Sequence, residues 1–303
     1  MLKKIMNIIN PFNNEDTDNK LLYIIRIILQ YLFIYIVGLL VAEGVVIVFH
    51  YALGYDVLNG EMMNIDTMLL FKYYGYIITI ITAMIFVKKV NKSSISELGF
   101  NQKVTDYFKG FLPAIISLFT IITILMVLGQ IHFEGFNKNV DFKLLLLFLG
   151  GFIIQGAMEE ILCRGFLMTQ LNKKIGIHLS ILISFIAFSF PHYSSFLEDG
   201  LLIGIVAIIN LLLVTYVFSY LMLKYKNIYV CSGFHSIWNF ILFGIIGLNL
   251  SGTVNNFSLL NFNANEKILM GGSYGIEASI ITTVILLILI IILSRNNLIK
   301  QSK

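Results

Sequence analysis

The sequence predicts an all-α, polytopic membrane protein, a helix bundle with about eight transmembrane helices. Of its 303 residues, 58% are hydrophobic and only 13% are charged, and the mean hydropathy is +0.86. Soluble domains carry about 25% charged residues. Since about 20 helical residues cross the hydrocarbon core, apolar runs of similar length are candidate spans. The candidates cover residues 27–53, 68–87, 108–130, 143–170, 176–194, 201–223, 228–247 and 276–294.

Lysine and arginine residues sort to alternate connectors, which predicts the orientation of the chain. Basic residues favour the cytoplasmic side of a membrane. With a cytoplasmic N-terminus, the cytoplasmic set is Lys3, Lys4, Lys20, Lys88, Lys89, Lys92, Lys103, Lys173, Lys174, Lys224, Lys226, Arg295, Lys300 and Lys303. The outer loops hold only Lys138 and Lys267, with Lys143 at an edge. The sequence therefore predicts a multi-pass protein of the cytoplasmic membrane with both termini cytoplasmic. This sorting accounts for the net charge of +4, so we expect no nucleic-acid partner.

Neither a repeat nor a low-complexity linker divides the chain, so we expect one transmembrane domain at residues 27–294. Residues 1–26 are expected to form a cytoplasmic tail, either disordered or partly helical on the membrane surface. Residues 295–303 are expected to form a second cytoplasmic tail. The connector 248–275 is rich in Asn, Ser and Gly and is expected to be an exposed outer loop.

Several polar residues in or near the spans are interpreted as structural. Small polar side chains and single carboxylates often join helices within a membrane. The two cysteines lack metal-type spacing, and we expect them to be small buried side chains. This structural set is Glu43, His50, His132, Cys163, His178, Asn210 and Cys231.

The most informative stretch is MEEILCRGF, residues 158–166, which interrupts an otherwise apolar span. Ionisable groups in a span usually face the protein interior or a water-filled cavity, because they are costly in lipid. Glu160 and Arg164 are four residues apart and can pair on one helix face. Glu159 is rotated from Glu160 by about 100° and cannot easily use the same arginine. The spacing predicts one paired carboxylate and one that is free to act elsewhere.

The same four-residue spacing recurs in two later spans. Phe188 and His192 are four apart in AFSFPH, and His235 and Asn239 are four apart in GFHSIWNF. Pro191 is expected to break or kink its helix just before His192. Counting ~1.5 Å of rise per residue from the cytoplasmic ends places these side chains at depths that overlap that of Glu159. We therefore predict one polar cavity that holds Glu159, His192, His235 and Asn239.

This set of side chains suits the hydrolysis of an amide. A glutamate and a histidine can share a water molecule and remove its proton, and a second histidine and an asparagine can donate to the oxyanion. The alternative is a zinc site with Glu159, His192 and His235 as ligands. The chain contains no HExxH, the helix motif of common zinc proteases.

The three motifs, in this order, resemble the CAAX protease and bacteriocin-processing (Abi) family of intramembrane proteases. EExxxR is matched by Glu159, Glu160 and Arg164, FxxxH by Phe188 and His192, and HxxxN by His235 and Asn239. The motif core covers about residues 143–247.

The resemblance implies a role for each motif residue. Glu159 would activate water together with His192, while His235 and Asn239 would hold the oxyanion. Glu160, Arg164 and Phe188 would orient the site. It also implies a metal-independent glutamate mechanism without a cofactor, with zinc dependence as the alternative.

The predicted function is an intramembrane endopeptidase that cleaves a membrane-associated peptide or protein within or beside the bilayer. The abundance of Ile, Asn and Lys indicates an AT-rich bacterial genome, and bacteria generally lack prenylated CAAX proteins. Bacterial members of the family are linked to maturation of peptide pheromones or bacteriocins and to self-immunity. The alternatives are a non-catalytic bacteriocin-immunity or envelope scaffold protein, and a transporter that uses Glu159 and the histidines as a proton relay.

Overall fold

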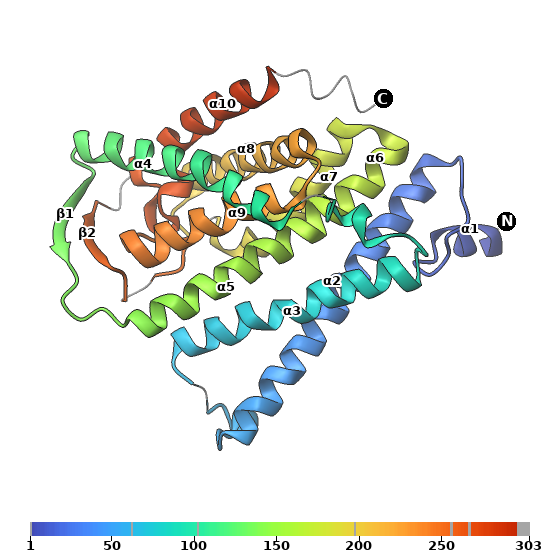
Figure 1. Cartoon of the computed structure of the whole chain (residues 1–303), viewed down its shortest axis with the longest axis horizontal. Helices are drawn as coiled ribbons and strands as arrows, with labels where there is room; N and C mark the ends of the chain where they lie inside the picture. Colours follow the sequence, from blue (N-terminus) through green and yellow to red (C-terminus); the bar gives the residue numbers. More distant parts are fainter. Residues whose placement is uncertain are drawn as a thin grey trace.

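The computed structural model describes residues 2–61, 63–101, 103–196, 198–254, 257–265 and 268–295, and most of them are helical (Figure 1). The α-helices are α1 (Leu2–Ile9), α2 (Lys20–Ala52), α3 (Ile65–Lys89), α4 (Phe111–Val127), α5 (Phe142–Glu160), α6 (Thr169–Ile175), α7 (Ile177–Ser189), α8 (Leu201–Tyr225), α9 (Ile228–Phe240) and α10 (Ile280–Ser294). Two π-helical segments, η4 (Ile161–Met168) and η6 (Ile241–Ile246), extend α5 and α9.

The remaining elements are short. The 3₁₀ segments are η1 (Val57–Asn59), η2 (Ile95–Leu98), η3 (Val104–Gly110), η5 (Phe190–Ser195), η7 (Ile268–Met270), η8 (Gly272–Tyr274) and η9 (Ile276–Ala278). The strands β1 (Ile131–Phe136) and β2 (Leu260–Ala264) form one antiparallel pair with a bulge between Phe133 and Gly135.

Five of the described helices begin where a polar capping residue precedes an apolar run. The side chains of Asn19, Asn64, Asp141, Asn227 and Ser279 each accept a hydrogen bond from a backbone N–H in the first turn of α2, α3, α5, α9 and α10, respectively. Such caps satisfy N–H groups that have no partner inside the helix. In a membrane this matters more than in water, because an unpaired backbone group is costly in lipid.

All eight predicted spans correspond to apolar helices. Within the described residues, six stretches are long and apolar enough to cross a membrane, and they cover Lys20–Ala52, Ile65–Lys89, Val104–Val127, Phe142–Ile175, Leu201–Tyr225 and Ile228–Ile246. The other two predicted spans are shorter apolar helices, Ile177–Tyr193 and Ile280–Ser294. The predicted polytopic helix bundle is therefore confirmed, with one small β-pair added.

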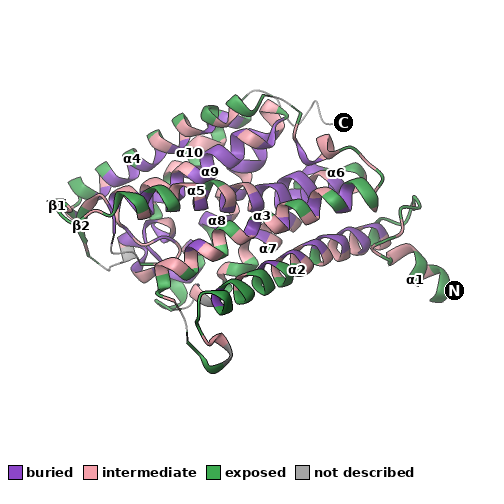
Figure 2. Cartoon of the chain, turned by 60° about the horizontal axis from the view of Figure 1, so that its bottom comes forward, coloured by how far each residue is buried: buried purple, intermediate pink, exposed green. Residues whose placement is uncertain are grey.

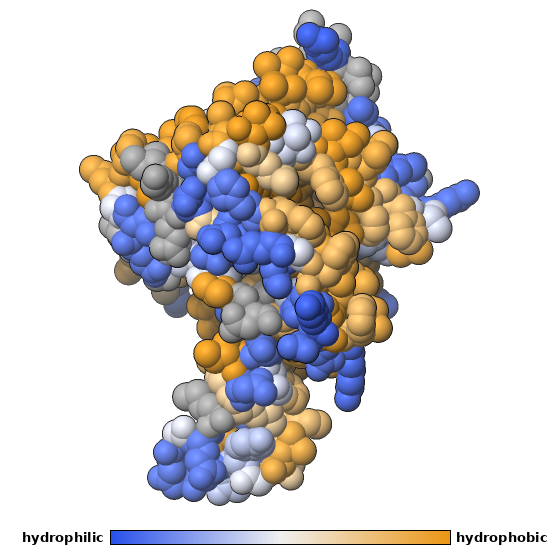
Figure 3. Space-filling view, turned by 90° about the vertical axis from the view of Figure 1, so that its left-hand side faces the viewer, coloured by the Kyte–Doolittle hydropathy of each residue, from blue (hydrophilic) through white to orange (hydrophobic). Residues whose placement is uncertain are grey.

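The outer face of the bundle is strongly hydrophobic. Large apolar side chains such as Leu40 on α2, Ile116 on α4 and Ile292 on α10 are more than half exposed. Figure 2 shows exposed positions running along α2 and α4. Apolar surface of this extent requires a partner, and in a multi-pass membrane protein that partner is the lipid bilayer. Figure 3 shows hydrophilic residues gathered at the end that carries β1 and β2, with hydrophobic surface around them.

The connectors segregate to two sides of the bundle, as the alternation of spans requires. Lys174 on α6 lies 2.8 Å from Asp16 in the N-terminal segment, and Lys173 lies 2.8 Å from Glu97 on η2. Three connectors predicted to be cytoplasmic are thus in contact. Two predicted outer connectors are joined by the β1–β2 pair. Which side faces the cytoplasm stays a prediction, as does the division into two tails and one domain; residues 296–303 lie outside the described residues.

Helix α9 lies at the centre of the bundle. In its most apolar stretch 72% of the residues are buried, against 17% for α2, and it packs against α4, α5, α8 and η3. Small residues permit this close packing. A Cβ atom on Gly156 of α5 would lie 2.6 Å from Oγ of Ser236 on α9, and Gly233 of α9 directly meets the backbone of Tyr107.

The segment 248–279 differs from the expectation of an exposed outer loop. It carries β2 and three 3₁₀ turns, and Leu248, Leu250 and Tyr274 in it are buried. Asp199, before α8, accepts hydrogen bonds from the Ser273 hydroxyl and from the backbone N–H groups of Ser273 and Tyr274. The Asn, Ser and Gly content here supplies turns and hydrogen bonds rather than solvent exposure. As a result, the last α-helix begins at Ile280 and not at residue 276.

The interpretation of the structural polar residues is right for most of them. Cys163 and Cys231 are buried and free, and His50 is buried with its ring bonded to the Val46 carbonyl. Asn210 joins α8 to the start of α10 through the carbonyl oxygens of residues 277 and 279. The interpretation is wrong for Glu43, which is exposed on α2, because this part of α2 lies at the edge of the bundle.

Candidate active site

The two adjacent glutamates lie at the end of α5, where the helix continues into the π-helical segment η4. Glu160 is fully buried and its Oε1 atom accepts a hydrogen bond from Nη1 of Arg164 at 3.1 Å. Arg164 is also fully buried, and its Nη2 donates to Oγ1 of Thr215 on α8 at 3.1 Å. The guanidinium carbon lies 4.4 Å from the ring centre of Phe188. The predicted Glu160–Arg164 pair is therefore present, and Phe188 covers it.

His235 on α9 connects this ion pair to the second glutamate. Its Nδ1 lies 3.0 Å from Oε1 of Glu160, and its Nε2 lies 3.6 Å from Oε2 of Glu159. The ring stacks on Phe218, with centroids 5.0 Å apart. An ionised carboxylate only accepts hydrogen bonds. The His235 ring can therefore donate to both Glu160 and Glu159 only when both of its nitrogens carry a proton. The ring is thus held in one orientation with Nε2 toward Glu159.

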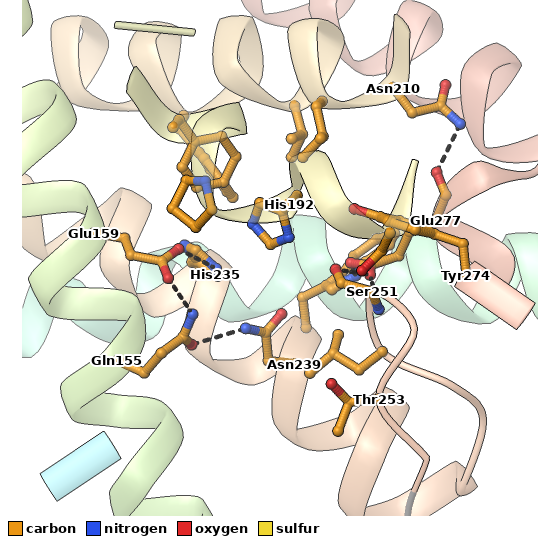
Figure 4. A pocket seen from close by; sticks show the side chains of 18 of the residues that line it. Gln155, Glu159, His192, Asn210, His235, Asn239, Ser251, Thr253, Tyr274 and Glu277 are labelled. Carbon is orange, nitrogen blue, oxygen red and sulfur yellow. Dashed lines mark hydrogen bonds and ion pairs between the residues drawn. The ribbon is translucent and has the colours of Figure 1, made fainter. Parts of the chain in front are cut away.

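Glu159 is not part of the arginine pair, in agreement with the helical spacing. Its Oε1 accepts a hydrogen bond from Nε2 of Gln155 at 2.7 Å, one turn earlier on α5. Its Oε2 is buried and has no hydrogen-bond partner among the described residues. Gln155 in turn accepts a hydrogen bond from Nδ2 of Asn239 at 2.9 Å. Figure 4 shows this chain of two hydrogen bonds beside the cavity.

His192 reaches the same cavity from another element. Helix α7 ends at Ser189, and Pro191 is the second residue of the 3₁₀ segment η5, so the predicted break is present. The ring of His192 lies 5.9 Å from that of Phe188, and none of the hydrogen bonds in the described part of the chain involves it. In Figure 4, His192 lies between Glu159 on one side and Glu277 on the other. Its ring nitrogens are therefore open to a ligand.

A cavity of about 260 Å³ brings the four predicted residues together. Glu159, His192, His235 and Asn239 all line it, along with aromatic side chains from α3, α8 and α9. The structure thus brings together the set that the sequence predicted, whereas Glu160 and Arg164 lie behind it and do not line the cavity.

The polar residues of the cavity that the sequence reasoning missed include Gln155 and Glu277. Gln155 could have been found from its position one helical turn before Glu159. Glu277 lies just before α10, and its Oε1 accepts from Nε1 of Trp238 at 3.1 Å, while its Oε2 accepts from the backbone N–H and the hydroxyl of Ser251. The only signal for Glu277 in the sequence was its position, as an acidic residue at the start of the last apolar run.

Tyr274 lines the cavity from the same segment as Glu277. Its phenol is buried, and this burial raises the pKa of Tyr274 above its ordinary value. The hydroxyl oxygen is inaccessible to solvent and has no hydrogen-bond partner among the described residues.

The metal alternative does not fit this arrangement. Within the described ranges, no group of three or more His, Cys, Asp or Glu side chains is placed so that it could hold a metal ion. We therefore derive no step through a metal.

Together these features define a class of protein, a multi-pass membrane protein that encloses a carboxylate, two histidines and an amide around one cavity. Residues 141–241, about a third of the chain, match the model of a family described as type II CAAX prenyl endopeptidase, Rce1-like. The predicted resemblance to the CAAX protease and bacteriocin-processing family is thereby confirmed. All seven motif residues lie inside the matched segment, and Glu277 lies outside it. Among curated proteins and solved structures, none matches this chain.

Proposed function

We propose that the protein is an intramembrane endopeptidase in which Glu159 and His192 activate a water molecule. The observation that carries this proposal is the environment of Glu159. Glu159 lines the cavity and is separate from the Glu160–Arg164 pair; its Oε2 is buried, lies 3.6 Å from Nε2 of His235 and has no hydrogen-bond partner in the described chain. A buried acceptor without a hydrogen-bond partner costs free energy, so a water molecule or substrate that bonded to Glu159 would stabilise the site.

In this proposal the water oxygen attacks the carbonyl carbon of a peptide bond. Its proton passes to Glu159 or His192, and the negative charge that forms on the carbonyl oxygen is held by His235 and Asn239. The proton then passes to the amide nitrogen as the C–N bond breaks. The products are a carboxylate and an amine, and the two bases return to their starting forms.

The proposed role of Glu160 and Arg164 is to hold the site rather than to react. Both side chains are completely buried, and they do not line the cavity. Glu160 fixes the ring of His235 through Nδ1, and Arg164 fixes Glu160. A catalytic group must be held within a fraction of an ångström of its productive position, which is what such a supporting layer provides.

The proposed substrate is a small peptide associated with the membrane, such as a pheromone or bacteriocin precursor. A cavity that combines aromatic and aliphatic side chains with polar ones, and that lies among membrane-spanning helices, suits an extended peptide with both apolar side chains and backbone amides. We further propose that the protein lies in the cytoplasmic membrane with both termini in the cytoplasm, on the basis of the lysine distribution.

The test is proteolysis of fluorogenic peptides by the purified protein in detergent, with Glu159→Gln as the matched inactive variant. We expect cleavage by the wild type that survives a strong zinc chelator and is lost in Glu159→Gln. Cleavage that is abolished by the chelator and restored by zinc would replace the proposed mechanism with a metal-dependent one. Equal cleavage by both proteins would refute the role of Glu159. In cells, an immunity phenotype that persists in Glu159→Gln would favour the non-catalytic immunity or scaffold function.

A further inference from the structure

Gln155 occupies a position that the family motifs do not include. It lies on α5 one turn before Glu159, and it is buried beside the cavity. Both of its hydrogen bonds within the described chain go to residues of the site. Its Nε2 donates to Oε1 of Glu159 at 2.7 Å, and its Oε1 accepts from Nδ2 of Asn239 at 2.9 Å.

The direction of this chain of hydrogen bonds is set by the carboxylate. An ionised carboxylate can only accept, so Gln155 must turn its NH₂ group toward Glu159. The amide oxygen of Gln155 must then face Asn239, which responds by turning its own NH₂ group toward Gln155. One charge on α5 therefore fixes the orientation of two amides in series, the second of them on α9.

This orientation leaves the required atoms free. Asn239 uses one of its two N–H groups for Gln155 and keeps the other for a ligand. Glu159 uses Oε1 for Gln155 and keeps Oε2, which has no hydrogen-bond partner among the described residues. An asparagine turned the other way would present an oxygen to a developing oxyanion and repel it.

We propose that Gln155 is a positioning residue that couples the base Glu159 to the oxyanion donor Asn239; this inference rests on the proposed function. The side chain of Gln155 then has two tasks that the motif residues cannot perform alone. Gln155 holds the carboxylate of Glu159 through Oε1, which leaves Oε2 beside Nε2 of His235, and it turns an N–H of Asn239 toward the substrate.

Two substitutions separate positioning from packing. Gln155→Met keeps the length of the side chain and removes both hydrogen bonds. Gln155→Glu keeps the shape and makes the hydrogen bond to Glu159 depend on a proton. The protonated acid can donate to Glu159 and accept from Asn239, as the glutamine does. The ionised form places two carboxylates side by side, where like charges repel.

The experiment measures kcat and KM for peptide cleavage between about pH 5.5 and pH 8, the range in which shared protons of carboxylate pairs can titrate. For Gln155→Met we expect kcat to fall by about 10- to 100-fold, the size of effect that a small misplacement of a catalytic group produces. We expect KM to change by less than about twofold, since the substrate contacts remain. For Gln155→Glu we expect activity relative to the wild type to rise as the pH falls.

The matched control is Gln30→Met on α2. Gln30 is another buried amide in a span, but it donates to the carbonyl of Pro11, far from the cavity. We expect its kcat to equal that of the wild type.

The outcomes distinguish this inference from the proposed function. Wild-type kcat in Gln155→Met, with no cleavage by Glu159→Gln, would overturn the positioning role and leave the proposed function intact. A loss in Gln155→Glu that is the same at every pH would also overturn it, because packing alone would then explain the effect. If Gln155→Met does not fold, the pH dependence of Gln155→Glu decides the question. Cleavage by Glu159→Gln at the wild-type rate would refute the proposed function itself.

Discussion

Nδ1 of His235 and Oε1 of Glu160 lie 3.0 Å apart, although the two residues are 75 positions apart in the sequence. The same oxygen accepts a hydrogen bond from Arg164. One buried carboxylate therefore joins α5, η4 and α9 at the point where the cavity begins. This relationship connects the stability of the bundle with the geometry of the site.

The buried ion pair gives the first prediction. Glu160→Gln leaves the Arg164 guanidinium buried without a counter-charge, and breaking such a pair typically costs about 3–5 kcal/mol. We expect a large fall in the thermal unfolding temperature in detergent, measured by intrinsic fluorescence. The control is the double variant Glu160→Gln with Arg164→Met, which removes both charges and should recover part of the lost stability. Equal stability of the single variant and the wild type would contradict the role assigned to the pair.

The close approach of α5 and α9 gives the second prediction. In Gly156→Ala the new Cβ would lie 2.6 Å from Oγ of Ser236, so the helices must separate. Overpacking of this kind typically costs about 1–3 kcal/mol, and it should also reduce cleavage, because Glu159 and His235 lie on the two helices that move. The matched control is Gly44→Ala on α2, where no described atom lies within 4 Å of the new Cβ. We expect Gly44→Ala to be neutral or slightly stabilising. Equal changes in stability and cleavage in the two variants would count against the close contact between Gly156 and Ser236.

The carboxylate of Glu277 gives the third prediction. It holds the backbone N–H of Ser251 at 2.9 Å and the indole of Trp238 at 3.1 Å, and so ties the segment 248–279 over the cavity. Hydrogen bonds to a charged group contribute about 1.5–3 kcal/mol. In Glu277→Leu we therefore expect amide hydrogen exchange at Ser251 to accelerate by about 10- to 100-fold. The control is Asn139→Leu, in the predicted outer connector after β1. Unchanged amide hydrogen exchange at Ser251 in Glu277→Leu would show that other contacts hold the segment.

Glu97 gives a prediction about pH. Burial raises the pKa of its carboxyl, but hydrogen bonds from Lys173 and Gln170 outweigh that effect, and the pKa is lowered from 4.5. A group whose pKa is lower in the folded protein stabilises it above the unfolded value, and this contribution is lost as the pH falls through the folded value. Half-exposed ion pairs contribute only about 0.2–1 kcal/mol.

The measurement compares thermal unfolding of the wild type and Glu97→Gln across this range. We expect the wild type to be the more stable protein at pH 7 and the difference to disappear below about pH 4. A difference that stays constant down to about pH 3 would mean that the glutamate charge is not its cause.

Much of the fold could be predicted because its signals are local. Hydropathy over about 20 residues marks a span, and all eight predicted spans correspond to apolar helices. The spacing of Glu159, Glu160 and Arg164 on one helix also determines which carboxylate pairs with the arginine. The exposed position of Glu43 could not be predicted in this way, because hydropathy does not tell which face of a helix meets the bundle.

The fold of segment 248–279 could not be predicted for a different reason. Its composition is typical of an exposed loop, yet contacts with Asp199, Trp238 and α8 bury it. These partners are distant in the sequence, so no local pattern records them. The same is true of Glu277, which enters the cavity only because this segment folds over it.

The sequence by itself determined that this is a helical membrane protein, which apolar segments become its helices, and which of them carry the motif residues. It could do so because hydrophobicity and helical periodicity act over a few turns of one chain segment. Only the tertiary structure decided that His235 connects two glutamates, that Gln155 joins Glu159 to Asn239, and that the last connector closes over the cavity. The physical reason is that these contacts form between helices, and their partners are selected by the packing of α5 against α9 rather than by any spacing along the chain.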